Sequence, residues 1–174
     1  SLMRLYINEN SLKKIPKSLF KLRYLSHLDT SRNRIAKLPK IHEGALKNLE
    51  KLDVSYNRLE FLPNGIGNLE KLKELHADRN LIIELPESIG FLSELELLTL
   101  KTNFLCELPE SFSLLSSLSH LDLESNEFHE IPEILGSLDA LKYLNFNYNH
   151  LKNKKKIIGG LPLLEELYLN WNKI

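Results

Sequence analysis

Asparagine recurs at an almost constant interval along this chain of 174 residues. Six of the seven intervals between successive marker asparagines are 23 residues and one is 24, and a leucine stands eight residues before each marker. The marker asparagines are Asn10, Asn33, Asn57, Asn80, Asn103, Asn126, Asn149 and Asn172. A period in this range indicates stacked structural repeats. The sequence therefore predicts a solenoid in which each repeat contacts its two neighbours.

The repeated unit reads L-x-x-L-x-L-x-x-N-x-L-x-x-L-P-x-x-I-x-x-L-x-x, and residues 49–71 follow it closely. Leucines at unit positions 4 and 6 alternate with polar residues, which is typical of a strand with one buried face. The asparagine at position 9 can hydrogen-bond the turning backbone, and stacking should align these asparagines in a ladder. The proline at position 15 can begin a helical turn. Stacked units of this kind predict a parallel sheet over a shared core.

Two repeats depart from this unit. The second is one residue longer, with residues 41–45 before Leu46, and we expect its outer segment to bulge. It also has Thr30 where leucine is expected, a polar residue that should bond locally. The seventh replaces Leu-Pro with Lys154-Lys155, which favours an irregular, solvated loop.

This pattern resembles the leucine-rich-repeat family over the whole chain, and its L-P-x-x-I-x-x-L form is similar to repeats of Ras-associated scaffold proteins, Roco-type kinases and bacterial leucine-rich-repeat proteins. The resemblance implies an α/β solenoid, a horseshoe with a parallel concave sheet and short helical, 3-10 or irregular convex segments. It implies one domain over 1–174 with about 7.5 repeats. Neither end shows the polar cap that a terminal repeat needs, so we expect a fragment of a longer array. The expected repeats are 2–24, 25–48, 49–71, 72–94, 95–117, 118–140, 141–163 and a partial 164–174.

Charge and cysteine content limit the partners and the compartment. The 23 basic and 23 acidic side chains cancel, which argues against nucleic acid or an anionic membrane surface as the main ligand. No apolar run approaches the roughly 20 residues that span a bilayer, so we expect no membrane insertion. Cys106 is the only cysteine, and there is no Asn-x-Ser/Thr sequon. These features favour the cytoplasm, with a secreted or surface-bound bacterial protein as the alternative.

Side chains at unit positions 3, 5, 7 and 8 should face the concave side, and aromatic residues gather there in the last two repeats. Tyrosine and tryptophan are enriched among the residues that dominate binding energy at interfaces, so these rings are candidates for a protein-binding anchor. The alternative is that they cover the open end of the solenoid. The candidate concave residues are Tyr143, Asn145, Asn147, Tyr148, Tyr168, Asn170 and Trp171, with the charged Asp122, Glu124, Lys101 and Arg79.

A second candidate surface is an acidic edge at unit positions 13 and 16. Its members are Glu84, Glu87, Glu107, Glu110, Glu130 and Glu133, and the first two repeats carry lysine at the same positions. Such charge patterning can steer a basic partner. It can equally be a solvated face on which long side chains spread apart.

Catalytic and metal-binding patterns are weak. Cys106 and His129 share unit position 12 in adjacent repeats, about 5 Å apart, but the flanking glutamates would raise the pKa of the thiol and oppose a nucleophilic role. His27, His76 and His120 lie on the same face, and successive histidines are two repeats apart. Two repeats correspond to about 10 Å, which is too far for these side chains to share a zinc ion. We therefore predict no enzyme and no cofactor.

The sequence thus predicts a protein–protein interaction module, a scaffold or recognition domain that binds a partner protein mainly through its concave strand face. The alternative is the recognition arm of a larger enzyme, a GTPase-kinase or an effector ligase, whose catalytic domain lies outside this chain. The variable positions of the repeat determine the partner, so its identity and the oligomeric state stay open.

Overall fold

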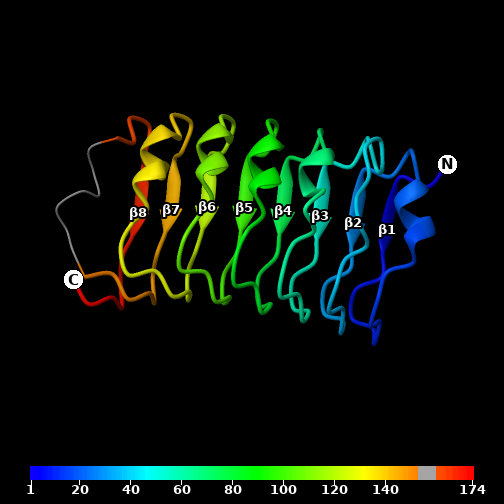
Figure 1. Cartoon of the computed structure of the whole chain (residues 1–174), viewed down its shortest axis with the longest axis horizontal. Helices are drawn as coiled ribbons and strands as arrows, with labels where there is room; N and C mark the ends of the chain where they lie inside the picture. The colour runs from blue at the N-terminus through cyan, green and yellow to red at the C-terminus, as the bar shows by residue number, and fades with distance from the viewer. Residues whose placement is uncertain (153–159) are drawn as a thin grey trace.

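Short parallel strands are stacked one after another along the whole length of the molecule. The computed structural model describes residues 1–152 and 160–174. In these residues eight strands form one sheet in the order of the chain (Figure 1). They are β1 (Arg4–Tyr6), β2 (His27–Asp29), β3 (Lys51–Asp53), β4 (Glu74–His76), β5 (Leu97–Thr99), β6 (His120–Asp122), β7 (Tyr143–Asn145) and β8 (Glu166–Tyr168). The predicted parallel sheet is confirmed.

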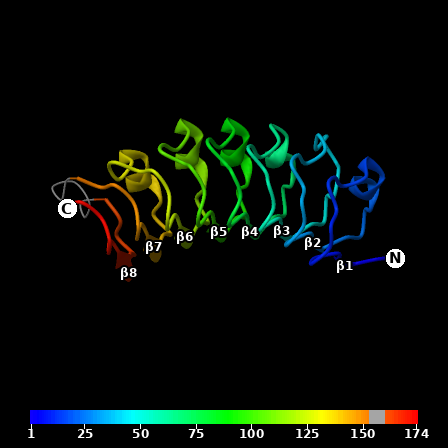
Figure 2. The same cartoon turned by 90° about the horizontal axis from the view of Figure 1, so that it is seen from below.

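Single-turn 3-10 helices cover the opposite side of the stack. In the described residues they are η1 (Lys17–Lys21), η2 (Ile66–Asn68), η3 (Glu87–Phe91), η4 (Glu110–Leu114) and η5 (Glu133–Ser137). Figure 2 shows a gentle bend with the strands on the inner side and these helices on the outer side. The predicted solenoid with a concave sheet and short convex segments is therefore confirmed.

Proline starts most of the outer turns, as its position in the repeat predicts. The residue before η1 is Pro16, which is extended and whose carbonyl accepts a hydrogen bond from the Leu19 N–H at 3.1 Å. The carbonyls of Pro86, Pro109 and Pro132 accept the equivalent hydrogen bond at the start of η3, η4 and η5. Proline suits this position because its fixed φ is compatible with the turn and it has no N–H to leave unpaired.

The core lies between the sheet and the outer helices and is continuous along the stack. In the fourth repeat Leu72, Leu75, Ile82, Ile89 and Leu92 are all fully buried. Alternation along the strand directs leucine inward from each repeat, so residues such as Leu28 and Leu52 pair in register. Burial of a side chain of this size contributes about 1.5–3 kcal/mol. One repeat alone could not bury these faces, which is why the stack forms as a unit.

The asparagines form the predicted ladder. Asn80 donates from Nδ2 to the carbonyls of Ala77 and Asp78 in its own repeat, and to that of Val54 in the preceding repeat at 3.1 Å. Its Oδ1 accepts the Leu59 N–H at 3.0 Å. The amide therefore satisfies polar backbone groups of two repeats at once. Equivalent bonds to the preceding repeat are made by Asn33, Asn57, Asn103, Asn126, Asn149 and Asn172.

The residue before each of these asparagines has a left-handed backbone. Its φ lies between 51° and 59° in every repeat, at Glu9, Arg32, Tyr56, Arg79, Thr102, Ser125, Tyr148 and Trp171. A left-handed conformation is unfavourable for a residue with a Cβ, yet glycine occupies none of these positions. The column therefore carries eight side chains at the edge of the concave face, where a strand ends.

The second repeat departs from its neighbours as its extra residue predicts. In this described stretch, turns at 43–48 stand where the neighbouring repeats have 3-10 helices, with Gly44 at φ 73° and Leu46 at φ 47°. The interpretation of Thr30 was wrong in one respect. Its hydroxyl donates to the Asp53 carbonyl of the next strand at 3.2 Å and not to its own turn. The irregular loop predicted at Lys154-Lys155 lies outside the described residues.

Candidate functional site

The concave face brings the predicted aromatic residues together. The C-terminal aromatic cluster consists of Tyr143, Tyr148, Tyr168 and Trp171. The Tyr148 and Trp171 rings are parallel within 6°, with centroids 5.6 Å apart, and they are 50% and 73% exposed. The Tyr143 and Tyr168 rings lie 5.3 Å apart at a tilt of 42°. Tyr148 and Trp171 occupy the same unit position of adjacent repeats. Tyr143 and Tyr168 are diagonal neighbours, because β7 pairs Tyr143 with Glu166 and Asn145 with Tyr168, and alternate positions of paired strands face the same side.

A second stack, of two guanidinium groups on one ring, lies in the N-terminal half of the column of residues with left-handed backbone. The Arg32 guanidinium lies 4.3 Å from the centre of the Tyr56 ring, and the Arg79 guanidinium lies 5.3 Å from it. Cation–π contacts of this kind hold flat groups against each other. Sequence reasoning named Arg79 but missed Arg32 and Tyr56. Their shared unit position was the signal that could have found them.

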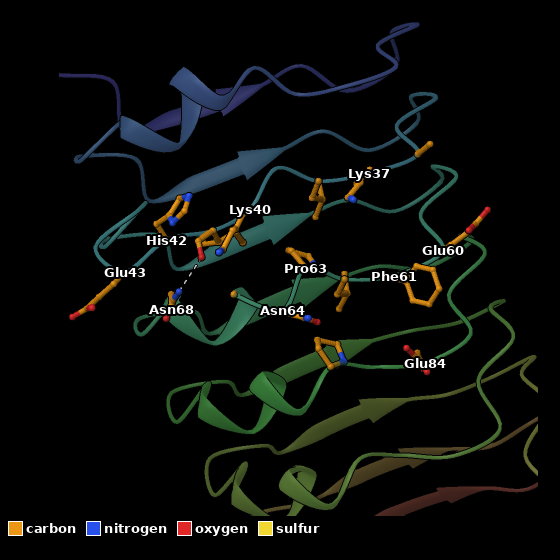
Figure 3. A pocket seen from close by; sticks show the side chains of 16 residues that line it. Lys37, Lys40, His42, Glu43, Glu60, Phe61, Pro63, Asn64, Asn68 and Glu84 are labelled. Atoms are coloured by element: carbon orange, nitrogen blue, oxygen red, sulfur yellow. Dashed lines mark hydrogen bonds between the residues drawn. The ribbon is translucent and has the colours of Figure 1, made fainter.

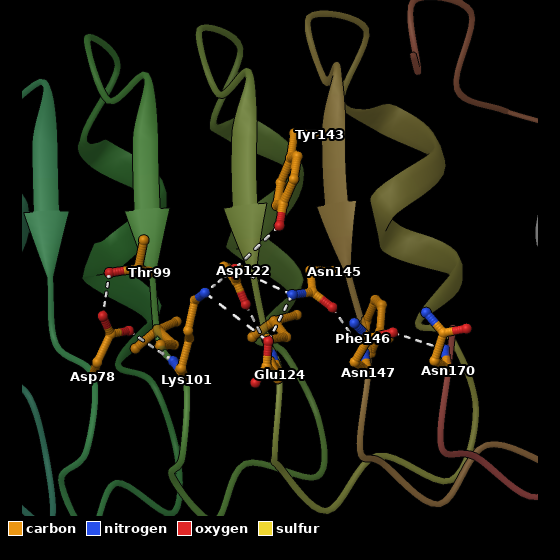
Figure 4. A network of polar contacts seen from close by, with 12 residues as sticks. Asp78, Thr99, Lys101, Asp122, Glu124, Tyr143, Asn145, Phe146, Asn147 and Asn170 are labelled. Carbon is orange, nitrogen blue, oxygen red and sulfur yellow. Dashed lines mark hydrogen bonds and ion pairs between the residues drawn. The ribbon is translucent and has the colours of Figure 1, made fainter. Parts of the chain in front are cut away.

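Charged and polar side chains connect the middle of the concave face to its C-terminal end (Figure 4). The Lys101 ammonium lies 2.9 Å from Asp122 Oδ2 and 3.9 Å from Glu124. Asn145 Nδ2 donates to Glu124 at 3.0 Å and to Asp122 at 3.3 Å. The concave network comprises these four residues with Asp78, Thr99 and Tyr143.

Burial and charge in the concave network shift the pKa values of Tyr143, Lys101 and Asp78. Burial raises the pKa of Tyr143. Burial acts to lower the pKa of Lys101, but the hydrogen bond and negative charge of Asp122 outweigh it and the net shift is upward. Burial raises the pKa of the Asp78 carboxyl, and hydrogen bonds from the Lys101 N–H and the Thr99 hydroxyl offset part of that rise. The Lys101 cation is therefore held in place by its anionic partner.

The structure places the predicted contact residues at two depths. Asp122 and Asn145 are 1% and 3% exposed, so they lie beneath the surface and position their neighbours. The Lys101 and Glu124 side chains are 39% and 31% exposed and remain accessible to a partner. The side-chain oxygen of Asn147 already has a partner within the chain, since this Oδ1 accepts the Asn170 N–H at 2.7 Å. Asn170 itself is exposed at the end of the network.

His120 stacks on Tyr143, which belongs to both the concave network and the aromatic cluster, and it gives a pH-dependent prediction. Its ring stacks on Tyr143 at 3.9 Å, and burial lowers its pKa below the ordinary value of 6.5. The unfolded chain therefore binds a proton more readily than the folded one, and stability falls as pH drops from 7 through 6.5 toward the lowered pKa. We expect His120→Phe to keep the stack and lose less stability between pH 7 and pH 5 than the natural chain. Urea unfolding followed by circular dichroism at both pH values measures this, and equal losses in the two proteins would contradict it.

The six glutamates of the acidic edge are all exposed, as a solvated or partner-binding surface requires. Glu87 accepts the Ser111 N–H from the adjacent repeat at 3.1 Å, so one carboxylate also supports the stacking of η3 on η4. Glu84 lies opposite Phe61 in a parallel backbone bridge. The bridge joins the third repeat to the fourth at this edge.

The structure does not join the residues that the sequence offered for catalysis or metal binding. Among them, no hydrogen bond or ring contact joins the exposed Cys106 to His129, whose ring lies 5.5 Å from that of His150. No group of three or more His, Cys, Asp or Glu residues in the described part is placed to hold a metal ion. None of the helices found there is long and apolar enough to cross a membrane.

The parallel sheet, the asparagine ladder and the outer 3-10 helices define a class of repeat proteins that present an extended recognition surface. The family described as "Leucine-rich repeat region" matches residues 2–103, and that described as "Leucine Rich Repeat" matches residues 117–138. The chain belongs to the leucine-rich-repeat family. Membership supports a protein-interaction module.

Solved structures give the same assignment. A leucine-rich-repeat protein of Leptospira interrogans is 28% identical with a TM-score of 0.75, over 97% of this chain and 54% of that one. TLR13 in complex with ssRNA13 is 30% identical with a TM-score of 0.87, over 99% and 25%. The plant peptide hormone receptor RGFR1 in complex with RGF2 is 30% identical with a TM-score of 0.75, over 96% and 28%. This chain thus spans about half of the first of these proteins and about a quarter of the other two. No curated protein sequence matches it significantly.

Proposed function

We propose that the chain binds a partner protein through its concave face, with the C-terminal aromatic cluster as the anchor. The parallel, exposed pair of Tyr148 and Trp171 carries this proposal. Large stiff rings supply contact area at a low cost in conformational entropy. They are enriched among interface residues that contribute most to affinity. Lys101 and Glu124 supply accessible charges of both signs beside the anchor, which suits a polar, selective rim.

Two observations favour a protein over a nucleic acid as the partner. The chain carries equal numbers of basic and acidic side chains, whereas binding to a phosphate backbone rewards a basic surplus. The concave network pairs its lysine with two carboxylates and leaves little free positive charge there. A receptor of similar fold occurs in complex with RGF2, which supports a protein or peptide ligand, although another relative occurs with ssRNA13.

Removal of the exposed ring pair tests the proposal. We expect Tyr148→Ala/Trp171→Ala to weaken partner binding by about 2 kcal/mol or more, about thirtyfold, because hot-spot rings of this type contribute on that scale. Pulldown followed by mass spectrometry would compare proteins captured by the natural chain and by the variant. The captured partner would then be titrated against both proteins to obtain Kd. Circular dichroism would establish that the variant is folded.

A matched variant removes two rings from elsewhere on the surface. Tyr24 and Phe91 are 65% and 64% exposed and lie outside the concave columns. Tyr24→Ala/Phe91→Ala should therefore capture the same partner with unchanged affinity. A partner that binds the concave variant as tightly as the natural chain would overturn the proposed anchor.

A further inference from the structure

Large apolar side chains are exposed on the edge that follows the strands, in the middle of the stack and away from both ends. Leu81, Ile83 and Phe104 are 41%, 49% and 50% exposed, and Phe61 beside them is 46% exposed. These four residues are the apolar edge patch. At the unit position of Leu81 and Phe104 the other repeats carry polar residues, namely Ser11, Arg34, Arg58, Glu127, His150 and Lys173. The patch is therefore particular to repeats 3 to 5.

The backbone holds the patch together. The Phe104 N–H donates to the Ile82 carbonyl at 2.8 Å, in the same way that the Leu81 N–H donates to the preceding repeat. This second ladder sets Leu81 and Phe104 side by side at about 5 Å. Ile82 is fully buried between Leu81 and Ile83, so these two neighbours point outward together, about 6.6 Å apart.

Glutamates border this patch. Glu60, Glu84 and Glu107 are exposed and occupy the adjoining unit positions 12 and 13 of repeats 3 to 5. Arg58 stands on the N-terminal side, and Lys37 and Lys40 of the second repeat line the cavity beyond Phe61. The negative charge is therefore concentrated beside Leu81 and Phe104, in repeats 4 and 5. A partner surface that pairs apolar side chains with a basic border would complement it.

A cavity adjoins the patch at Phe61 (Figure 3). It has a volume of about 950 Å³ and extends from Phe61, Glu60 and Glu84 past Pro63 to Asn68. The irregular outer segment of the second repeat forms the opposite wall. Its Ile41 carbonyl accepts a hydrogen bond from Asn68 at 2.9 Å, which fixes that wall against η2. The patch therefore continues into a groove of defined shape.

We propose that the apolar edge patch forms a second docking surface, whose occupant is a basic amphipathic helix of another protein. Apolar side chains at i, i+3, i+4 and i+7 of a helix cover a strip about 10 Å long, which matches a patch two to three repeats wide. Lysine or arginine along one side of that strip would meet Glu84 and Glu107, which occupy the same unit position of adjacent repeats. This surface is separate from the concave face and independent of the proposed function.

Other occupants fit less well. A two-fold contact between copies of this chain would place the same surface against itself, and Glu84 and Glu107 of one copy would face those of the other. An anionic membrane would meet the same glutamates and be repelled. A basic helix complements both the apolar residues and the glutamates beside them.

A labelled synthetic peptide would test this surface. The probe carries leucine at i, i+3, i+4 and i+7 and lysine elsewhere, and fluorescence anisotropy measures its Kd for the full chain. We expect Leu81→Ser/Phe104→Ser to weaken binding about tenfold or more. Glu84→Lys/Glu107→Lys should do the same and reduce the dependence on salt. Both pairs are exposed, so the variants should remain folded.

Two controls separate this surface from the concave face. Tyr148→Ala/Trp171→Ala should bind the probe as the natural chain does. A peptide with glutamate in place of lysine should bind at least about tenfold more weakly. Equal affinity of all variants for the probe, equal binding of the two peptides, or loss of binding only in the concave variant would each overturn the proposal.

The two other occupants, a second copy of the chain and an anionic membrane, are tested on the protein without the peptide. Analytical ultracentrifugation should show no dimer that depends on Phe104, so the natural chain and Phe104→Ser should sediment alike. Vesicles of phosphatidylcholine and phosphatidylserine should not retain the chain. A dimer that depends on Phe104 would assign the patch to a second copy, and vesicle binding that depends on Phe104 would assign it to a membrane. Either result would replace the basic helix as the occupant.

Discussion

Asn103→Ala should lower the free energy of unfolding by about 2–4 kcal/mol, since each buried polar group left without a partner costs about 1–3 kcal/mol. Asn103 is 5% exposed. Its Nδ2 donates to the carbonyls of Ala77 and Leu100 at 3.0 Å, and its Oδ1 accepts the Ile82 N–H at 3.0 Å. Alanine leaves the Ile82 donor unpaired inside the stack and breaks the link between two repeats. Guanidinium unfolding followed by circular dichroism measures the change.

Asn10→Ala is the matched control. Asn10 occupies the same unit position but is exposed, and its amide bonds only to carbonyls of its own repeat, those of Ile7 and Asn8. Exposed substitutions of this kind usually change stability by less than about 0.5 kcal/mol. The ladder would not have the energetic role assigned to it if both substitutions cost the same.

Gly90→Ala should also destabilise the chain, by about 1–3 kcal/mol or more, because the added methyl overpacks the contact between η3 and η4. A Cβ at Gly90 would lie 2.2 Å from the Ser111 carbonyl oxygen and 2.7 Å from its Cβ. Backbone cannot yield as a flexible side chain does, so the two turns must separate. The effect opposes the ordinary gain of about 1 kcal/mol when alanine replaces glycine in a helical turn.

Gly136→Ala should have the opposite sign. Gly136 has the same unit position in η5, but among the described residues the nearest atom to its added Cβ is 3.9 Å away. Alanine there meets no clash with the described residues, removes conformational freedom from the unfolded chain and should stabilise by about 0.4–1 kcal/mol. Unfolding midpoints for the two variants should move in opposite directions, and a gain in both would disprove close packing at Gly90.

Much of the fold could be predicted from the sequence because its determinants are local and repeated. The leucine alternation specifies which side of a strand is buried, as the register of Leu28 with Leu52 shows. The asparagine supplies both a donor and an acceptor at the turn, so its ladder follows from chemistry alone. Insertion of one residue in the second repeat correctly predicted an irregular outer segment there.

The surfaces were less predictable because they depend on how long side chains arrange themselves between repeats. Asp122 was expected to face a partner, but Lys101 and Asn145 close over it and leave it 1% exposed. Thr30 bonds to the next strand because its own turn is already satisfied by Asn33. The apolar edge patch was missed because its residues are unremarkable along the chain and stand out only when unit positions are compared between repeats.

The parallel contact between Tyr148 and Trp171 also gives the chain an intrinsic fluorescence signal for its C-terminal repeats. Trp171 is the only tryptophan among the 174 residues and stacks on a neighbour 23 positions earlier. Its emission therefore responds to separation of the last two repeats, whereas the circular dichroism signal averages over all strands. In a solenoid whose repeats interact only with their neighbours, the two signals distinguish unfolding that begins at the C-terminal repeats from unfolding of the whole stack at once.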